Sequence, residues 1–299
     1  MIIDQGLPFS VEGGLVRGRL VRLGPLLDTI LDDQHGYPVP VAALLAETVA
    51  LAVVLASSLK FEGIFTLQTQ GDGPVSLLVA DVTSAGDVRA HARFDAQRLA
   101  GIKPGERASV PKLLGGGYLS FTVDQGADTE RYQGIVELTG ETLEDCARTY
   151  FKQTEQLDTA IEAAVRPSAA GQGWAAAALM IQRMPSGSAN GPIMVAEDAE
   201  ESWRRAEVLL GSVTAAEMLD PDLTPQTLLY RLFHAEQLQL FEAKPLAARC
   251  RCSRDKVAGA LASIPVAELR EIADVEGRVV VTCEFCRAEH AISLSELGA

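Results

Sequence analysis

The chain has 299 residues, of which 47% are hydrophobic, so it can bury a large core and is long enough for more than one domain. Its formal net charge is −14, and its lysines and arginines form no long cluster. Because nucleic-acid binding needs a basic surface that neutralises phosphates, this composition argues against a nucleic-acid partner.

Residues 1–185 predict an α/β (α+β) domain with a mostly antiparallel sheet and packed helices. Turn signals at 70–73 and 85–87, rich in glycine and aspartate, separate β-branched runs in the manner of hairpins. The strand-like runs cover residues 15–23, 63–70, 74–82, 88–94 and 118–123. Helices are expected at 40–58, 143–156 and 173–182, the second of them capped by Thr142 and Asp145.

Residues 39–59 are apolar for about the length of a membrane span. The stretch is nevertheless rich in alanine, contains Glu47 near its middle and is followed by Lys60, which favours a core helix over a span. The first residues include Asp4 and lack the basic region and apolar run of a secretory signal. We therefore expect a cytoplasmic protein with no membrane partner.

Small residues at 184–192 mark a boundary, after which the composition becomes acidic. Residues 190–249 contain ten acids against five bases, and apolar side chains from Trp203 to Leu210 fall at loose helical spacing. Thr224 followed by Pro225 predicts the start of a second helix with an apolar side. We predict a helical, partly metastable linker over 186–237 that docks reversibly, with permanently packed helices as the alternative.

Residues 238–299 predict a small zinc-binding domain that carries two close cysteine pairs. A β-rich entry at 238–241 leads to the first pair, Ser253 caps a short helix that runs to residue 262, and Pro265 begins another helix. A strand at 278–282 precedes the second pair, and a return strand follows at 291–294. Two turns about thirty residues apart are the usual frame of a small zinc module.

Cys250 and Cys252 form the first pair, and Cys283 and Cys286 form the second. In a reducing compartment such pairs are typical of metal ligands or redox thiols. Zinc prefers tetrahedral thiolate ligation, whereas Mg²⁺ and Ca²⁺ prefer oxygen, so these four side chains predict one Zn²⁺ per chain. His290 is an alternative ligand, although four cysteines already complete the shell.

Two hypotheses follow for the metal. The spacing alone favours a structural zinc that holds together about fifty residues whose own core is too small. The sharper hypothesis is that loss of the metal is a regulatory step, because either pair can close into a disulfide and expel the ion. A structural zinc contributes on the order of 10–16 kcal/mol to folding, and whole domains are stable by about 5–15 kcal/mol. The module should therefore unfold when the ion leaves.

The sequence does not favour an enzyme. His234 and Glu236, together with the second cysteine pair, mimic the signature of zinc deaminases. Thr282 stands where that signature has proline, and the first cysteine pair would have no role. A thioredoxin-like redox motif is also disfavoured, because its cysteines open a helix after a strand.

Several segments of the sequence are considered together. They are the cysteine pairs at 250–254 and 283–286, the upstream segment 230–234, and the N-terminal segments 16–19, 58–63 and 68–74. Together they resemble the 33-kilodalton heat-shock protein family, the redox-regulated holdase chaperones of bacteria. The resemblance covers nearly the whole chain, and the paired cysteines are its most specific part.

The resemblance implies a cycle that the spacing alone does not show. The reduced, zinc-bound form would be inactive, and oxidative stress with unfolding conditions would form disulfides Cys250–Cys252 and Cys283–Cys286, release zinc and melt the linker. The oxidised form would be a homodimer that holds unfolding client proteins without ATP, and reduction would reverse the switch. Cys146 has no place in this pattern and is expected to be a buried, small apolar residue. A zinc-stapled structural adaptor without redox switching is the alternative function.

Overall fold

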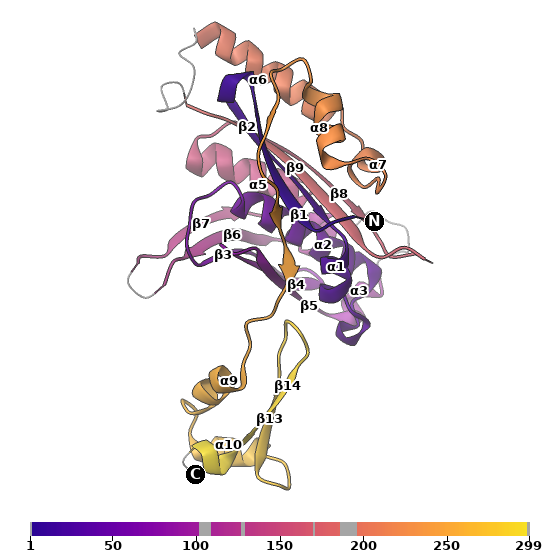
Figure 1. Ribbon diagram of the computed structural model, residues 1–299. Helices are drawn as coiled ribbons and strands as arrows, with labels where there is room; N and C mark the ends of the chain where they lie inside the picture. The colour runs from indigo at the N-terminus through magenta and orange to yellow at the C-terminus, as the bar shows by residue number, and fades with distance from the viewer. Residues whose placement is uncertain (1, 102–108, 127–128, 170, 186–195, 298–299) are drawn as a thin grey trace.

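Two largely antiparallel sheets enclose a long apolar helix in this computed structural model, which describes residues 2–101, 109–126, 129–169, 171–185 and 196–297 (Figure 1). The first sheet has the order β10-β1-β2-β9-β8, and β11 also pairs with β1. Its strands are β1 (Gln5–Val11), β2 (Val16–Leu23), β8 (Thr159–Arg166), β9 (Ala175–Arg183), β10 (Gln239–Leu240) and β11 (Lys244–Pro245). The predicted boundary at 184–192 lies outside the described residues from residue 186 onward.

The second sheet has the order β12-β5-β4-β3-β6-β7, in which only the pairing of β12 with β5 is parallel. Its strands are β3 (Ile64–Gly71), β4 (Val75–Thr83), β5 (Asp87–Phe94), β6 (Gly117–Asp124), β7 (Tyr132–Glu137) and β12 (Ala247–Ala248). The strand runs expected at 15–23, 63–70, 74–82, 88–94 and 118–123 are all present, as β2 to β6.

Helix α2 (Val39–Ala56) lies between the sheets and packs on both, which confirms the core helix expected there. Its apolar residues cover every side, so it has no polar face to leave in water. It is long and apolar enough to cross a membrane, but 78% of its residues are buried inside the protein. Thr48, at its middle, is fully buried and donates its hydroxyl to the carbonyl of Leu44 at 2.8 Å.

Shorter helices close the edges of the core. They are α1 (Pro25–Ile30), α3 (Ala96–Leu99), α4 (Val110–Leu113) and α5 (Leu143–Tyr150), with single turns at Glu12–Gly14 and Asp33–His35. The expected cap of α5 is present, because the Thr142 hydroxyl accepts from Asp145 N–H and the Asp145 carboxylate accepts from Thr142 N–H. A π-helical turn, Phe151–Glu155, follows α5 directly.

The helix predicted at 173–182 is wrong, because this segment forms strand β9. It lies at the centre of the first sheet, between β2 and β8, with Leu179 opposite Leu20. Both faces of β9 are covered, one by α2 and the other by a layer of helices, so residues 175–181 are all buried. A strand buried on both faces loses the alternating pattern, and its alanines then imitate a helix.

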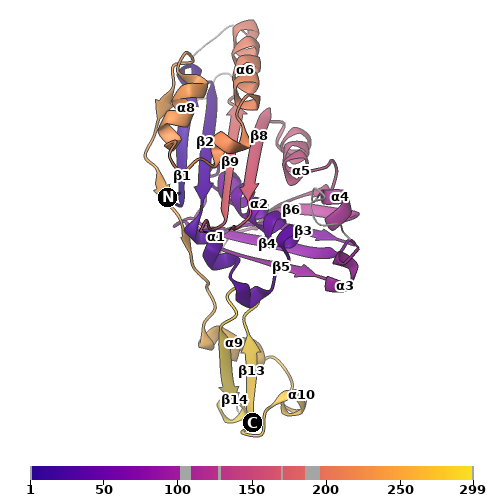
Figure 2. The ribbon, with the colours of Figure 1, turned by 90° about the vertical axis from the view of Figure 1, so that its right-hand side faces the viewer.

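Three helices from the predicted linker cover the outer face of the first sheet (Figures 1 and 2). They are α6 (Ala196–Gly211), α7 (Ala215–Met218) and α8 (Pro225–Phe233). As expected, Thr224 caps α8 by accepting from the N–H of Thr227. Trp203, Leu210 and Phe233 are buried against the sheet.

The chain then returns to the core before it reaches the cysteines. β10 and β11 pair with β1, and β12 pairs with β5, so residues 239–248 run from the first sheet to the second. The C-terminal body that follows contains α9 (Arg254–Leu261), α10 (Val266–Ile272), β13 (Arg278–Thr282), β14 (Glu289–Ser293) and the turn Leu294–Leu297. It projects from the core below β4 and β5 (Figures 1 and 2). Among the described residues, only Leu261, Leu269, Val279 and Ile292 form its buried centre.

Candidate metal centre and the cover on the first sheet

Four sulfur atoms meet where the C-terminal body joins the core. The Sγ atoms of Cys250, Cys252, Cys283 and Cys286 all lie within 4.8 Å of one another. Two contacts join different pairs, Cys250 to Cys283 at 3.7 Å and Cys252 to Cys286 at 3.5 Å. Zinc–sulfur bonds of about 2.3 Å place the ligands of one tetrahedral ion about 3.8 Å apart. The four sulfurs therefore fit around a single metal ion.

Local structure brings each pair to this point. Cys250 and Cys252 lie between β12 and α9, and Ser253 caps α9 by accepting from Lys256 N–H, as the sequence predicts. The second pair lies in the turn between β13 and β14. In that turn the N–H of Cys283 donates to Ala288 and the N–H of Arg287 donates back to the Cys283 carbonyl, both at 2.9 Å.

The thiols influence one another strongly. Burial opposes ionisation of Cys250, but hydrogen bonds from the Cys252 N–H and the three other thiols lower its pKa to about 7. Burial and its thiol neighbours raise the pKa of Cys252, and burial raises the pKa of Cys286. Ionisation of one thiol of the four is favoured, and ionisation of the others is opposed. All four can be thiolates together only when a cation lies among them.

The other candidate residues lie apart from the sulfurs. Within the described chain, the group of possible metal ligands contains the four cysteines and not His290. His290 lies on β14, opposite Val281 of β13. His234 contacts the carbonyl of Tyr230 through Nδ1, and Glu236 pairs with Arg205 at 2.7 Å, so neither joins the group.

Cys146 is fully buried on α5, and its thiol donates to the carbonyl of Thr139 at 3.1 Å. Burial raises its pKa, which keeps it in the unreactive thiol form. This is the buried, small apolar residue that the sequence predicts.

The two cysteine turns also dock on the second sheet, through contacts that sequence reasoning missed. Arg251, between the first two cysteines, places its guanidinium 2.5 Å from the carboxylate of Asp81 on β4. Asp81 is buried, with a side chain only 7% exposed, and also pairs with Arg89 at 2.8 Å and accepts from the Thr66 hydroxyl at 2.6 Å. The sequence offers no signal for this contact, because the partners are separated by 170 residues.

Phe285, between the last two cysteines, makes the second docking contact. The guanidinium of Arg89 lies over its ring, 3.9 Å from the centroid, in a cation–π arrangement. His35 contacts the carbonyl of Phe285 through Nε2 at 3.2 Å. Beside it, Glu284 pairs with Arg93 at 3.4 Å. Each cysteine turn therefore places a side chain against strands β4 and β5.

The linker helices are held on the first sheet by both apolar and polar contacts. Phe233 of α8 stacks on Phe9 of β1 with ring centroids 5.5 Å apart. A side chain at Gly18 would collide with the Phe9 ring, 2.0 Å from an added Cβ, so only glycine fits beneath it. The buried Arg22 of β2 donates to the carbonyls of Glu217 at 3.0 Å and Asp220 at 3.1 Å, which ties the loop before α8 to the sheet.

Comparison with known proteins places this arrangement in a family. The family model described as Hsp33 protein matches residues 4–293. A 33 kDa chaperonin of Caulobacter vibrioides is 41% identical over 281 residues, covering 93% of this chain and 91% of the relative. The 33 kDa chaperonin of Ectopseudomonas mendocina is 37% identical over 296 residues, covering 99% of this chain and 94% of the relative.

The fold is also found in a solved structure. The crystal structure of the 33 kDa chaperonin from Thermotoga maritima matches with a TM-score of 0.81 at 21% identity, covering 99% of this chain and 96% of the other. The expected fold class, an α/β core with mostly antiparallel sheets and a small C-terminal body with a cysteine cluster, is confirmed. Since the family model spans nearly the whole chain and both relatives match end to end, the chain belongs to the Hsp33 family of chaperones.

Proposed function

We propose that the chain is a redox-regulated, ATP-independent holdase that protects unfolding proteins from aggregation under oxidative stress. In this proposal the reduced form holds one Zn²⁺ through Cys250, Cys252, Cys283 and Cys286 and is inactive. The observation that carries it is the grouping of four thiols within 4.8 Å on a body whose buried centre has four side chains. Because the fold of this body would depend on the metal, oxidation of the cysteine ligands can switch it between folded and unfolded states.

The chemistry of the switch is carried by the thiolates. In each pair, two thiolates lose two electrons as one S–S bond forms, and one hydrogen peroxide accepts these electrons with two protons and becomes two water molecules. We take the pairing Cys250–Cys252 and Cys283–Cys286 from the family resemblance. Oxidation of both pairs removes all four ligands, so the ion is released. Closing two short loops adds little order to the chain, so the disulfides do not replace the metal.

Loss of the metal then unfolds the C-terminal body. A structural zinc contributes on the order of 10–16 kcal/mol, which exceeds what four buried apolar side chains supply. Arg251 and Phe285 would leave Asp81 and Arg89 as the cysteine turns lose their shape, since these docking side chains lie between the ligands. The body would therefore detach from the second sheet.

The released segment is continuous with the linker, which suggests how the signal reaches the client surface. Residues 239–248 pair with β1 and β5, and α8 lies just before them. Freeing one end of this segment weakens those short pairings and the docking of α6 to α8. Their departure would expose the apolar face formed by side chains such as Phe9, Leu20 and Leu179, together with the buried sides of the helices. Contiguous apolar surface of this kind binds unfolded chains.

The remaining expectations are part of the same proposal. The partners are unfolding client proteins and, when oxidised, a second copy of the chain, with no nucleic-acid or membrane partner. The protein acts in the cytoplasm and is not an enzyme. We retain the units 1–185, 186–237 and 238–299 as core, linker and switch, with residues 239–248 as the tether between linker and metal centre.

The structural adaptor is the second candidate. The buried pair of Arg251 and Asp81 is the observation in its favour, because a firmly docked metal body suits a fixed surface. The two candidates differ in the effect of oxidation, since an adaptor loses function when zinc leaves and the holdase gains it.

The test uses purified, reduced, zinc-loaded protein treated with peroxide under mild heat. We expect zinc release together with suppression of aggregation of an unfolding client, both reversed by a dithiol and zinc. Cys146→Ser should behave like the native chain, and Cys283→Ser should fail to retain zinc. Zinc release with no gain of suppression would reject the holdase and leave the adaptor.

A further inference from the structure

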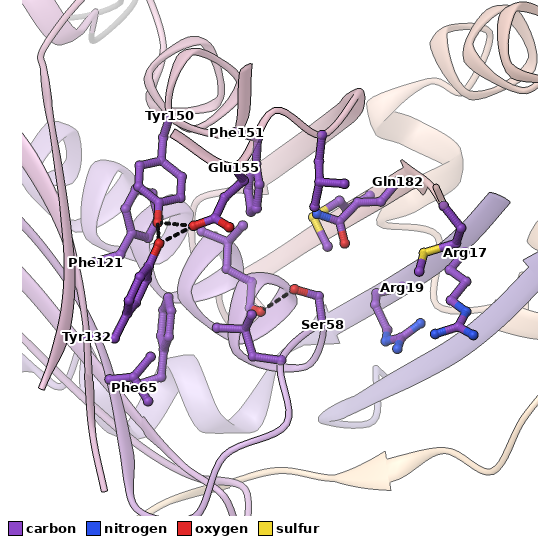
Figure 3. A pocket seen from close by; sticks show the side chains of 16 residues that line it. Arg17, Arg19, Ser58, Phe65, Phe121, Tyr132, Tyr150, Phe151, Glu155 and Gln182 are labelled. Carbon is purple, nitrogen blue, oxygen red and sulfur yellow. Dashed lines mark hydrogen bonds between the residues drawn. The ribbon is translucent and has the colours of Figure 1, made fainter. Parts of the chain in front are cut away.

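A cavity of about 180 Å³ opens between the two sheets at the C-terminal end of α2 (Figure 3), and none of the four clustered cysteines lines it. Protein interiors are closely packed, and this hollow reaches from the surface to buried side chains such as Phe65 and Met180. It is comparable with an engineered cavity of about 150 Å³ that takes up benzene. The space therefore suits a small organic molecule with a ring.

The two ends of the cavity differ in character. One end is aromatic and is formed by Phe65, Phe121, Tyr132, Tyr150 and Phe151. The other end carries Arg17 and Arg19, with Gln182 beside them (Figure 3). Arg17 is exposed and Arg19 is half-buried, and Tyr132 is exposed at the aromatic end, so both ends of the cavity reach the surface. A molecule with an apolar body and one anionic group would match both ends.

The two arginines have no carboxylate partner among the described residues. They alternate on β2 and therefore share one face. Arg19 donates from Nε to the carbonyl of Ser57 at 3.0 Å and to that of Gly18 at 2.7 Å, both neutral acceptors. Burial, and then the charge of Arg17, lowers the pKa of Arg19. The chain as a whole is acidic, with 40 acidic and 26 basic residues. Two neighbouring arginines on one face of β2 without an acidic partner therefore form a local positive charge that can bind an anion.

The polar groups at the aromatic end are already satisfied. Glu155 accepts hydrogen bonds from the hydroxyls of Tyr132 and, at 2.7 Å, of Tyr150, and the two hydroxyls lie 2.9 Å apart. This cluster offers no free donor to a ligand, and the Glu155 carboxylate repels an anion. The anionic group of a ligand is therefore directed to the arginines and its ring to the aromatic end.

The backbone at the cavity wall is also unusual. Phe151 and Glu155 belong to the π-helical turn after α5, which ends at Gln156 with φ at +52°. π-helical turns are rare and occur often at functional sites, and a non-glycine residue with positive φ is strained. This turn brings both side chains to the cavity, which indicates a built site and not a packing defect.

We propose that the cavity binds a small aromatic monocarboxylate, with its carboxylate between Arg17 and Arg19 and its ring against Phe65 and Phe121. A charge-assisted, two-armed contact of guanidinium with carboxylate gives the orientation, and burial of the ring gives most of the affinity. A larger polyanion such as a nucleotide is excluded by the size of the cavity and by Glu155. The site is independent of the metal centre, so the proposal stands whether or not the protein is a redox-regulated holdase.

The test compares two probes of the same shape, phenylacetate and its neutral isostere phenylacetamide, on the reduced full-length protein. Calorimetric titration gives both dissociation constants, and the shift in Tm gives an independent measure of binding to the folded state. We expect phenylacetate to bind at least about tenfold more tightly than phenylacetamide, because hydrogen bonds to charged groups are the stronger ones. Equal binding of the two probes, or no binding of phenylacetate at millimolar concentration, would overturn the proposal.

Variants then locate the site. Arg17→Gln is the least disruptive change, because the exposed side chain of Arg17 makes no hydrogen bond or ion pair with the described residues. With Arg19→Gln added, phenylacetate should bind no better than phenylacetamide, whose own affinity should be unchanged. The control is Arg131→Gln with Arg204→Gln, which alters the net charge equally at exposed arginines outside the cavity. Loss of the preference in the control, or its retention in the double variant, would contradict the assignment.

Discussion

Arg251 places its guanidinium 2.5 Å from the buried carboxylate of Asp81, which joins the first cysteine pair directly to the second sheet of the core. The same carboxylate binds Arg89, and Arg89 in turn lies over the ring of Phe285 from the second cysteine pair. One acidic side chain on β4 therefore organises the docking of both cysteine turns.

Asp81→Asn should loosen this docking and so weaken retention of the metal. Breaking a buried pair by removing one partner costs about 3–5 kcal/mol, because an uncompensated charge remains. We expect zinc to be released by peroxide at least about tenfold faster than from the native protein, as followed by the colour of a zinc-binding dye. Asp87→Asn is the control, since its 3.4 Å pair with the exposed Arg249 is worth about 0–1 kcal/mol. Equal release rates for Asp81→Asn and the native chain would show that docking and metal retention are uncoupled.

The disulfides formed on oxidation should lie within each turn, as Cys250–Cys252 and Cys283–Cys286. In the reduced structure sulfur contacts also join different turns, 3.7 Å for Cys250 with Cys283 and 3.5 Å for Cys252 with Cys286. Cross-turn disulfides would hold the C-terminal body together, whereas disulfides within a turn leave it free to unfold. Mass spectrometry of proteolytic peptides without reduction distinguishes the two outcomes. Predominance of cross-turn bonds would contradict the proposed release.

Phe233→Ala should undock the linker while the metal stays bound. Truncating a buried phenylalanine costs about 3–5 kcal/mol, and this one stacks on Phe9 beneath α8. The variant should suppress client aggregation in its reduced form, with one zinc per chain still measured. Tyr230→Ala, on the same helix but 62% exposed, should need oxidation like the native protein. Limited proteolysis reports whether the linker of the reduced Phe233→Ala protein is undocked. If the linker is undocked and the protein is still inactive, the sheet face beneath the linker is not the client surface.

Stability should fall with rising pH through the titration of Glu144. Burial, followed by the charges of Glu47 and Glu162, raises its pKa from 4.5 to about 8 against the opposing charge of Arg148. The folded state holds this proton more tightly than the unfolded state, so stability declines as the pH rises from about 4.5 to about 8.

Glu144→Gln removes this titration. It should leave stability near pH 4.5 unchanged and increase it at pH 8 by on the order of a few kcal/mol, measured by urea unfolding at each pH. Glu141→Gln, at an exposed position before the same helix, is the control for loss of one surface carboxylate. A Glu144→Gln effect that is the same at both pH values would show that the carboxyl is not perturbed by burial.

Most of the fold was predictable where a local sequence signal marks a turn, a cap or a long apolar helix. The hairpins around Gly71–Gly73 and Gly86, the caps at Thr142, Thr224 and Ser253, and the helix Val39–Ala56 all carry local signals that the structure bears out. β9 was mistaken for a helix because it is buried on both faces, and β1, β7 and β8 were not predicted. The pairing of residues 239–248 with both sheets rests on long-range contacts that no local pattern encodes.

The candidate site was likewise predictable only in part from the sequence. The four cysteines were singled out from their spacing, and the structure brings their sulfurs within 4.8 Å of one another. That they hold a metal ion stays a prediction. Asp81, Arg89 and Phe285 were missed, since a buried ion pair between distant segments needs only complementary partners and leaves no periodic trace. The cavity lined by Arg17 and Arg19 is likewise a product of how the two sheets meet.

The most direct test of the central claim follows zinc release and chaperone activity in one sample of reduced, zinc-loaded protein. Peroxide is added under mild heat, and a zinc-binding dye and the light scattering of an unfolding client are recorded together. The account predicts that suppression of aggregation rises as one zinc per chain is released, and that a dithiol with zinc reverses both. Full release of zinc with no suppression, or suppression by the fully zinc-bound native chain, would contradict it.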